Sequence, residues 1–219
     1  MLPAYAELHC RSNFTFLTGA SHPEELVERA QALGYSALAL TDEASLSGVV
    51  RAHAEARRLG LHLIVGAQMQ LDAPGRGAET GPCLVLLAQS RRGYGNLAQW
   101  ITVARRRAGK GRYQALVTDL EGRVPHAPYL AGLPDCFALL LHRPWQSFES
   151  LFAQAMWLKT WFGAERCALA VELLHRAHDA HRLETVQRVA ELTGLTLVAA
   201  GDVLMHSRSR KPLQDVLAA

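Results

Sequence analysis

Residue types that bind metal ions stand at the ends of several predicted strands in this chain. Imidazoles and carboxylates are the nitrogen and oxygen ligands that proteins offer to zinc, manganese and similar cations. A centre that bridges metal ions and activates a water needs several such side chains in one place. The side chains at the ends of six predicted strands are His9, Asp42, Gln68, His142, Glu172 with His175, and Asp202.

This candidate set is incomplete as a metal centre. Gln68 carries a neutral amide, which is a poor substitute for a bridging carboxylate. Arg11 follows His9 by two residues and brings a permanent positive charge, which repels a metal ion. Leu204 follows Asp202 by two residues and cannot coordinate a metal. The pattern therefore predicts a site that is arranged like a metal centre but lacks part of its ligand set.

The elements that would position these residues alternate between strands and helices. Near-continuous apolar runs such as SALALTD (36–42) are typical of buried parallel strands. Such alternation predicts an α/β fold with parallel strands joined by right-handed crossovers. Strands are expected at 6–12, 36–42, 61–71, 83–89, 136–142, 167–174 and 195–203, and helices at 21–33, 45–59, 91–107, 146–162, 180–192 and from 212 onward.

Some local features are predicted in more detail. Ser21 is expected to be the N-cap of the first helix, with Pro23 near its start and Glu24 completing a capping box. Residues 72–82 are rich in Gly and Pro and predict a surface loop. The stretch 113–120 could form one short helix.

Both an open doubly wound sheet and a closed barrel fit seven strands that alternate with helices. An open sheet would concentrate the polar residues at one switch point, whereas a barrel gathers the ends of all its strands on one face. Because polar residues mark nearly all the strand ends, we expect a barrel. The last predicted helix reaches only Ala219 and is too short to bury its apolar side alone, so we expect the N-terminal piece of a longer protein.

Composition sets wider limits. The chain has 219 residues, 49% of them hydrophobic, and a formal charge of +3, which permits nucleic-acid contact without requiring it. We expect no membrane span, because no run of 18 apolar residues occurs, and no secretory signal. Widely separated cysteines without a CxxC pair indicate reduced thiols and a cytoplasmic protein. These cysteines are Cys10, Cys83, Cys136 and Cys167.

Two basic clusters occur, one at 105–112 and one at 208–211. A solvated helix end or loop is the simpler interpretation of each, and a nucleic-acid contact is the alternative.

Three segments of the sequence resemble a known family. They are residues 7–52 (ELHCRSNFTFLTG to SGVVRA), LIVGAQ (63–68) and VAAGDVLMHSRSRKPLQD (198–215). Together they resemble the N-terminal PHP (polymerase and histidinol phosphatase) domain of bacterial C-family DNA polymerases. The sequences of these segments are most similar to those of the error-prone branch, which acts in damage-induced translesion synthesis. The resemblance covers essentially the whole chain and implies a distorted seven-stranded βα barrel of the TIM-like PHP type.

The resemblance also implies a metal-ligand set, which this chain matches in part. The family's first strand ends in His-x-His, where this chain has His9-Cys10-Arg11. The family's Thr-Asp-His corresponds to Thr41-Asp42-Glu43 in this chain, and its Gly-x-Glu corresponds to Gly66-Ala67-Gln68. Its Asp-x-His corresponds to Asp202-Val203-Leu204, and its His after the sixth strand corresponds to His175. The retained positions are His9, Asp42, Glu43, His175 and Asp202, the lost ones are Arg11, Gln68 and Leu204, and His142 and His206 are nearby candidates without a clear equivalent.

Arg11 places a positive charge at a position where the family has a metal-binding histidine. A guanidinium in the pocket can pair with a carboxylate that would otherwise bind metal. We therefore predict that Arg11 takes the place of one metal ion by forming a salt bridge with Asp42, Glu43 or Asp202.

The favoured function is a structural or interaction module, 1–207, at the N-terminus of an error-prone DNA polymerase, with 208–219 starting the connection to the polymerase core. The alternatives are an active metal-dependent phosphoesterase, such as a 3′–5′ proofreading exonuclease, and a free-standing histidinol-phosphatase-like enzyme. No resident cofactor is expected beyond Zn or Mn at low occupancy, with Mg for the parent polymerase. Expected partners are the core of the same chain, accessory proteins of a translesion complex, and DNA, with Arg208, Arg210 and Lys211 as contact candidates.

Overall fold

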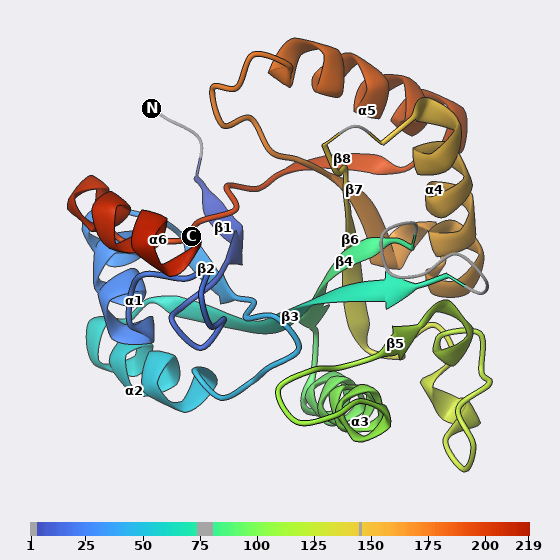
Figure 1. Cartoon of the computed structure of the whole chain (residues 1–219), viewed down its shortest axis with the longest axis horizontal. Coiled ribbons are helices and arrows are strands. Elements are labelled where there is room, and N and C mark those ends of the chain that lie inside the picture. The colour runs from blue at the N-terminus through green and yellow to red at the C-terminus, as the bar shows by residue number, and fades with distance from the viewer. Residues whose placement is uncertain (1–3, 74–80, 145) are drawn as a thin grey trace. The chain divides into compact units, whose positions relative to one another are not determined.

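The computed structural model describes residues 4–73, 81–144 and 146–219 (Figure 1). The chain divides into two compact units. Unit 1 comprises residues 1–67 and 200–219, and unit 2 comprises residues 68–199. Residues 74–80 of the predicted loop at 72–82 lie outside the described residues.

Unit 1 begins with parallel strands whose covering helices pack on an apolar core. Ala6 of the first strand pairs with Ala37 of the second, and Ala37 pairs with His62 of the third. Its core contains Val27, Leu38 and Ala52, which are almost completely buried. The elements are β1 (Ala6–Cys10), α1 (Pro23–Ala32), β2 (Ala37–Leu40), α2 (Val49–Leu59), the first part of β3 (His62–Asp72) and α6 (Lys211–Leu217).

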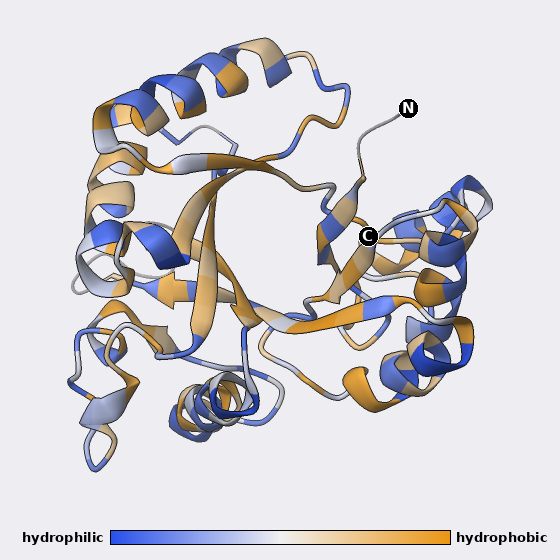
Figure 2. Cartoon of the chain, turned by 180° about the vertical axis from the view of Figure 1, so that it is seen from behind, coloured by the Kyte–Doolittle hydropathy of each residue, from blue (hydrophilic) through white to orange (hydrophobic). Residues whose placement is uncertain are grey.

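Unit 2 contains the remaining strands and three long helices. Figure 2 shows that these strands are mostly hydrophobic while the helices carry a hydrophilic side. The elements are the second part of β3, β4 (Cys83–Ala88), α3 (Arg91–Arg107), β5 (Ala115–Leu116), β6 (Cys136–Leu141), α4 (Phe148–Phe162), β7 (Cys167–Val171), α5 (Asp179–Thr193) and β8 (Thr196–Ala199).

The α/β class is confirmed, but one strand breaks the predicted parallel pattern. Strand β6 is parallel to β7, and β7 to β8, whereas β4 and β6 are antiparallel. The connection from β4 to β6 contains α3, β5 and 3₁₀ turns at Val117–Asp119 and Pro128–Leu130. A single helical crossover would have kept the two strands parallel, so this longer connection must reverse the chain once more.

The closed barrel is not confirmed. The strand order is the linear path β1-β2-β3-β4-β6-β7-β8, with β5 paired to β3 outside this path. No ladder that would close the path into a ring is found among the described residues. Seven strands in the predicted order are therefore present, while the eighth, β5, was missed because it has only two residues.

Several predicted element ends are wrong by a few residues. The N-cap of α1 is His22, not Ser21, and Glu25, not Glu24, accepts the hydrogen bond from the His22 amide. The helix expected from 45 begins at Val49, and the helix considered for 113–120 is β5 followed by a 3₁₀ turn. The reason at the first helix is that Ser21 is already engaged, because its hydroxyl accepts a hydrogen bond from the His206 amide.

Among the described residues, no helix is long and apolar enough to cross a membrane. None of the four cysteines, all of which lie in the described ranges, forms a disulfide, and all four are buried.

A buried carboxylate anchors the long β4–β6 connection of unit 2. Asp119 is 1% exposed and accepts two hydrogen bonds from the Arg107 guanidinium, at 2.5 and 2.6 Å. The Trp100 indole and the Leu116 amide donate to the same carboxylate at 3.1 and 3.0 Å. Arg107 is therefore a structural residue within the basic cluster at 105–112, not one of its solvated members.

We expect the substitution Asp119→Ala to lower the free energy of unfolding by about 3 kcal/mol, because it leaves a partly buried guanidinium and a buried indole N–H without their acceptor. Urea denaturation at pH 7 measures the change. Glu184→Ala, at an exposed position of α5, is the matched control and should change it by less than about 0.5 kcal/mol. Equal stability of the two variants would contradict this role of Asp119.

Candidate functional site

In unit 1, the segment around Val203 lies beside the end of β1 and brings two retained ligand candidates, His9 and Asp202, close together. The Val203 amide donates to the His9 carbonyl and the Arg11 amide donates to the Val203 carbonyl, both at 2.9 Å. Cys10 and Val203 form a parallel bridge. These contacts continue the parallel pattern past the end of β1 and bring Asp202 next to His9 and Arg11.

Glu7 fixes the same segment from the other end of β1. Its buried carboxylate accepts hydrogen bonds from the amides of Gly201 and His9 at 2.8 and 2.9 Å, and from the Tyr5 hydroxyl at 2.9 Å. A Cβ at position 201 would lie 2.3 Å from a Glu7 oxygen, so a larger residue there would displace the Glu7 carboxylate from its hydrogen bonds. Sequence reasoning missed Glu7, although an acidic residue inside an otherwise apolar strand was the available signal.

The predicted ion pair of Arg11 is present, and its partner is Asp202. The Arg11 Nη2 contacts the Asp202 Oδ1, and the His9 Nδ1 lies 3.8 Å from the same oxygen. The two paired side chains are only 12% and 19% exposed. The Asp202 backbone has a φ of 44°, in the left-handed region that Asp tolerates better than most residues. A guanidinium thus occupies the carboxylate that the family resemblance assigns to a metal.

Asp42 is also committed to partners within unit 1. Its buried carboxylate accepts hydrogen bonds from the Ser12 amide and hydroxyl, both at 2.7 Å, and from the Thr15 hydroxyl at 2.8 Å. Burial raises the pKa of Asp42, while these hydrogen bonds and the Arg11 charge oppose the rise. Asp42 therefore ties the β1–α1 connection to the end of β2. Glu43 follows it, and its amide donates to the Thr15 hydroxyl at 3.0 Å.

The residues after Asp202 hold the chain end against α1. The Leu204 carbonyl accepts from the Ala20 amide at 2.8 Å, and His206 lies 2.8 Å from the Ser21 hydroxyl and 3.7 Å from Glu25. Glu25 also pairs with Arg210 at 2.5 Å. His206 thus belongs to a polar cluster beside α1, together with Ser21, Glu25 and Arg210.

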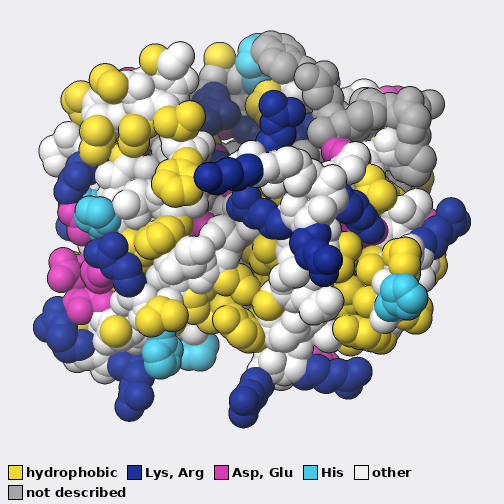
Figure 3. Space-filling view, turned by 60° about the horizontal axis from the view of Figure 1, so that its bottom comes forward, with side chains coloured by type: hydrophobic (Ala, Val, Ile, Leu, Met, Phe, Trp, Pro, Cys, Tyr) yellow, Lys and Arg dark blue, Asp and Glu magenta, His cyan; other side chains and the backbone are white. Residues whose placement is uncertain are grey.

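The predicted nucleic-acid candidates differ in their surroundings. Arg210 pairs with Glu25 and Lys211 pairs with Asp215, whereas Arg208 is exposed. Figure 3 shows Lys and Arg side chains standing out on the side of the molecule that lies at the bottom of Figure 1. Contact of 208–211 with nucleic acid stays a prediction.

The other candidates belong to unit 2. Gln68 lies within β3, not at its end, and is 8% exposed. His142 follows β6 and is 7% exposed; burial lowers its pKa, and its Nε2 lies 3.3 Å from the Gln146 carbonyl. Glu172 follows β7, and His175 is exposed with a φ of 57°.

Within the described ranges of the chain, no group of three or more His, Cys, Asp or Glu side chains is arranged to hold a metal ion. The residues of unit 1 do not fit a bridged metal centre, because the Arg11 cation sits on the Asp202 carboxylate and Leu204 offers no donor atom. We therefore derive no reaction step through a metal.

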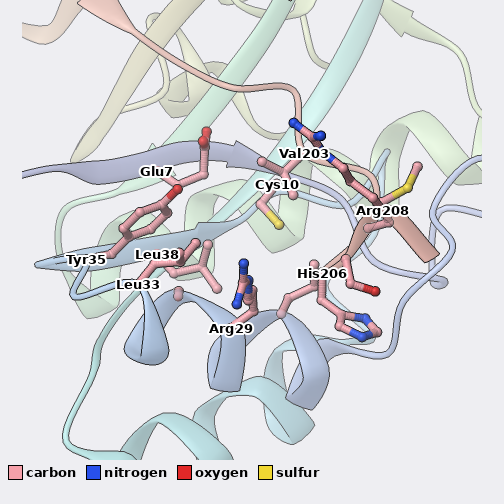
Figure 4. A pocket seen from close by; sticks show the side chains of 13 residues that line it. Glu7, Cys10, Arg29, Leu33, Tyr35, Leu38, Val203, His206 and Arg208 are labelled. Carbon is pink, nitrogen blue, oxygen red and sulfur yellow. The ribbon is translucent and has the colours of Figure 1, made fainter. Parts of the chain in front are cut away.

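A pocket of about 480 Å³ lies elsewhere in unit 1, between β1, α1, β2 and residues 203–208. Figure 4 shows Tyr35 and Leu33 on one side of it and His206 and Arg208 on the other. Its lining includes Glu7, Cys10 and the nearby candidate His206, but none of the five retained ligand positions. Burial raises the pKa of the Cys10 thiol well above its ordinary value, so this thiol is a poor nucleophile.

Comparison with known proteins identifies the family of this chain. The PHP domain matches residues 7–173. The chain belongs to the PHP domain family. Proteins named error-prone DNA polymerase are similar over its whole length, with 54% identity in Ralstonia nicotianae and 52% in Bordetella parapertussis. The chain spans 20% of the length of these relatives.

Solved structures support the fold of the PHP family member. An amidohydrolase from Chromobacterium violaceum aligns with a TM-score of 0.65 and 20% identity, covering 92% of this chain and 88% of that one. A proposed metal-dependent phosphoesterase from Bifidobacterium adolescentis aligns with a TM-score of 0.61 and 15% identity, covering 95% and 90%. At these identities the likeness concerns the fold alone.

We expect Asp202→Asn to lower the free energy of unfolding by about 2 kcal/mol, because the amide keeps the left-handed backbone but loses the charge that Arg11 pairs with. Thermal and urea denaturation measure the change. Asp215→Asn is the matched control, since its ion pair with Lys211 is exposed and should contribute less than about 0.5 kcal/mol. Similar small losses in both variants would show that the Arg11–Asp202 pair is not stabilising.

Asp42 predicts a pH dependence of stability. Because its folded pKa is raised above the ordinary value of 3.8, the folded state binds the proton more tightly than the unfolded state. The stability advantage of the wild type over Asp42→Asn should therefore be largest below about pH 4 and should fall as pH rises through the folded pKa. Urea denaturation of both proteins between pH 4 and pH 8 tests this sign. An advantage that grows with pH would contradict it.

Proposed function

We propose that this chain is the PHP domain of an error-prone DNA polymerase acting in damage-induced translesion synthesis, and that it serves as a structural and interaction module without catalysis of its own. The observation that carries the proposal is the ion pair between Arg11 and Asp202. Hydrolysis by a bridged metal centre needs anionic ligands that are free to share metal ions. In this chain one of those carboxylates already neutralises an arginine.

The surrounding contacts support the same conclusion. Asp42 directs both carboxylate oxygens to Ser12 and Thr15, so it acts as an acceptor for the β1–α1 connection. Gln68 and Leu204 replace the family's carboxylate and imidazole with groups that bind hard or borderline cations poorly or not at all. The names of the relatives support the polymerase assignment.

The proposed partners follow from the length of those relatives, of which this chain spans 20%. We propose that the polymerase core continues the same chain and supplies the Mg²⁺-binding carboxylates that nucleotide transfer requires. Accessory proteins of a translesion complex and DNA are further proposed partners, and a cytoplasmic location is proposed. The domain boundary at residue 208 remains a prediction, and residues 208–219 lie within unit 1.

An active metal-dependent phosphoesterase or 3′–5′ exonuclease is the second candidate. It is favoured by the retained His9, Asp42, Glu43, His175 and Asp202 and by the phosphoesterase-like fold. A histidinol-phosphatase-like enzyme would differ from it by acting on small phosphomonoesters.

Metal content separates the candidates. After dialysis with Zn²⁺ or Mn²⁺, we expect almost no metal in the wild-type chain by inductively coupled plasma mass spectrometry. The triple variant R11H/Q68E/L204H restores the ligand types of the family and should retain substantially more metal, because it removes the competing cation.

Nuclease and phosphatase assays complete this test. Stoichiometric metal in the wild type, together with hydrolysis that His9→Ala and Asp202→Asn abolish, would overturn the non-catalytic assignment in favour of the second candidate.

A further inference from the structure

Helix α3 of unit 2 presents an outward face that the proposed function does not use. The inward side of the helix is buried and includes Leu97, Trp100 and Ile101. The exposed positions recur at helical spacing, so they lie on one side of the helix. We call this side the α3 face and define it by the exposed residues Arg91, Arg92, Gly95, Gln99, Arg105 and Arg106. The helix lies at the bottom of Figure 1, and Figure 3 brings that side forward, where Lys and Arg side chains stand out.

Positive charge is concentrated on the α3 face and in the turn that follows it. Residues 90–118 include seven Arg or Lys residues and no Asp or Glu. Because the whole chain has a formal charge of +3, the rest of the sequence is net acidic. This asymmetry is typical of a surface that contacts an anionic partner.

Most of these cations are not neutralised by a carboxylate of the chain. Asp119 neutralises Arg107. Within the described ranges, no ion pair is found for Arg91, Arg92, Arg106, Lys110 and Arg112. By contrast, Arg58 near the end of α2 pairs with Glu55 of the same helix. The α3 face therefore differs from a solvated face on which charges of both signs alternate.

Helix stability does not explain the cations at the beginning of α3. Arg91 and Arg92 stand in its first turn, where the helix dipole disfavours positive charge and where no acidic residue occurs. Asp135 lies at this end and accepts a hydrogen bond from the Ser90 hydroxyl at 3.0 Å, but no ion pair joins it to either arginine in the described part of the chain. An anionic partner would offset the cost of these two charges.

Gly95 leaves the backbone open in the middle of the α3 face. Glycine inside a helix lowers the stability of the helix relative to alanine. A Cβ at position 95 would meet no heavy atom of the described residues within 4 Å, so packing within the chain does not require glycine there. The missing side chain instead allows a partner to approach the helix closely.

Contacts at the end of α3 hold the remaining cations in place. The Arg105 guanidinium carbon lies 5.9 Å from the centre of the Tyr113 ring. The Gln114 amide donates a hydrogen bond to the Ala104 carbonyl at 2.9 Å. The turn at 108–113, with two further cations, is therefore kept beside the last turn of the helix.

The dimensions of the α3 face indicate a polyanion with regularly spaced charges. Arg91 and Arg106 stand at opposite ends of the helix, about 22 Å apart along its axis. One strand of duplex DNA presents about six phosphates over this length. Arginine and lysine contact such phosphates, and Gln99 adds an amide that can donate to a phosphate oxygen.

A single strand fits the α3 face less well than a duplex. Proteins that bind single strands use a groove and several aromatic rings on which bases stack. The surface of a helix is convex, and Tyr94, at 43% exposure, is the one exposed aromatic residue of α3. We propose that the α3 face binds the sugar-phosphate backbone of duplex DNA without reading its base sequence. This inference rests on the proposed function, because it names the surface through which the module contacts DNA.

Fluorescence anisotropy of a labelled duplex of about 24 base pairs tests the α3 face with the 219-residue chain in EDTA. We expect binding at about 50 mM KCl that weakens steeply as the salt concentration rises, because protein cations displace the counterions of DNA. The double variants R91Q/R92Q and R105Q/R106Q should each weaken binding about tenfold and reduce the slope of log affinity against log salt by about two. Duplexes of different sequence should bind equally.

The matched control is R57Q/R58Q, since it removes the same two charges from an adjacent arginine pair in the last turn of α2. It should leave the affinity within about twofold of the wild-type value. Gly95→Glu adds a carboxylate to the middle of the α3 face, where the fold leaves space. It should weaken binding about tenfold without lowering the midpoint of thermal denaturation.

Several results would overturn the inference. They are the absence of duplex binding by the wild type, equal losses in R105Q/R106Q and R57Q/R58Q, and tighter binding of the corresponding single strand than of the duplex. Tighter binding of poly-glutamate than of DNA would also overturn it and would indicate an acidic protein partner. Metal content decides the proposed non-catalytic assignment, so the two proposals fail in different experiments.

Discussion

The arrangement of unit 1 depends on the alignment of residues 201–206 beside β1. Four hydrogen bonds fix this alignment. Three join backbone groups, two of them at Val203 and one from the Ala20 amide to the Leu204 carbonyl, and the fourth runs from the Gly201 amide to the Glu7 carboxylate. Because Val203 is hydrogen-bonded to both His9 and Arg11, the preceding residue Asp202 is held within reach of Arg11. The ion pair is thus a consequence of a backbone register that Glu7 and a glycine determine together.

A guanidinium in the place of a metal changes what the surrounding carboxylates can do. A divalent cation can bridge several anionic ligands and polarise a water, whereas a guanidinium donates hydrogen bonds in a fixed plane and has no open coordination position. It still neutralises a partly buried carboxylate, which would otherwise be costly to keep ionised. The Arg11–Asp202 pair is therefore the physical basis of the proposal that this chain does not hydrolyse phosphate esters.

In unit 2, the direction of each strand decides at which edge of the sheet the residues after it lie. The strand β4 is the one predicted strand with no candidate ligand at its end, and it is antiparallel to β6. Its carboxyl end therefore faces the edge opposite to that of β6 and β7. The ends of β6 and β7 are followed by His142 and by the connection that leads to Arg176 and Arg182, which together line one pocket of unit 2. Polar residues after neighbouring strands lie at the same edge of the sheet when those strands run in the same direction.

The α/β class, seven strands in their order and most helices could be predicted from the sequence alone. These features depend on local signals: the apolar period of each segment, the glycines that end α2 and α5, and the residue types after each strand. It also predicted the pairing of Arg11 with a carboxylate, because a buried guanidinium needs a counter-charge.

The choice among Asp42, Glu43 and Asp202 as the partner of Arg11 required the three-dimensional structure, since charge alone does not distinguish them. Asp42 is taken by Ser12 and Thr15, which no sequence spacing reveals. The reversed direction of β4 and the N-cap at His22 likewise depend on contacts between residues distant along the chain. Local propensity cannot encode such contacts, because their energies exist only once the backbone has brought the partners together.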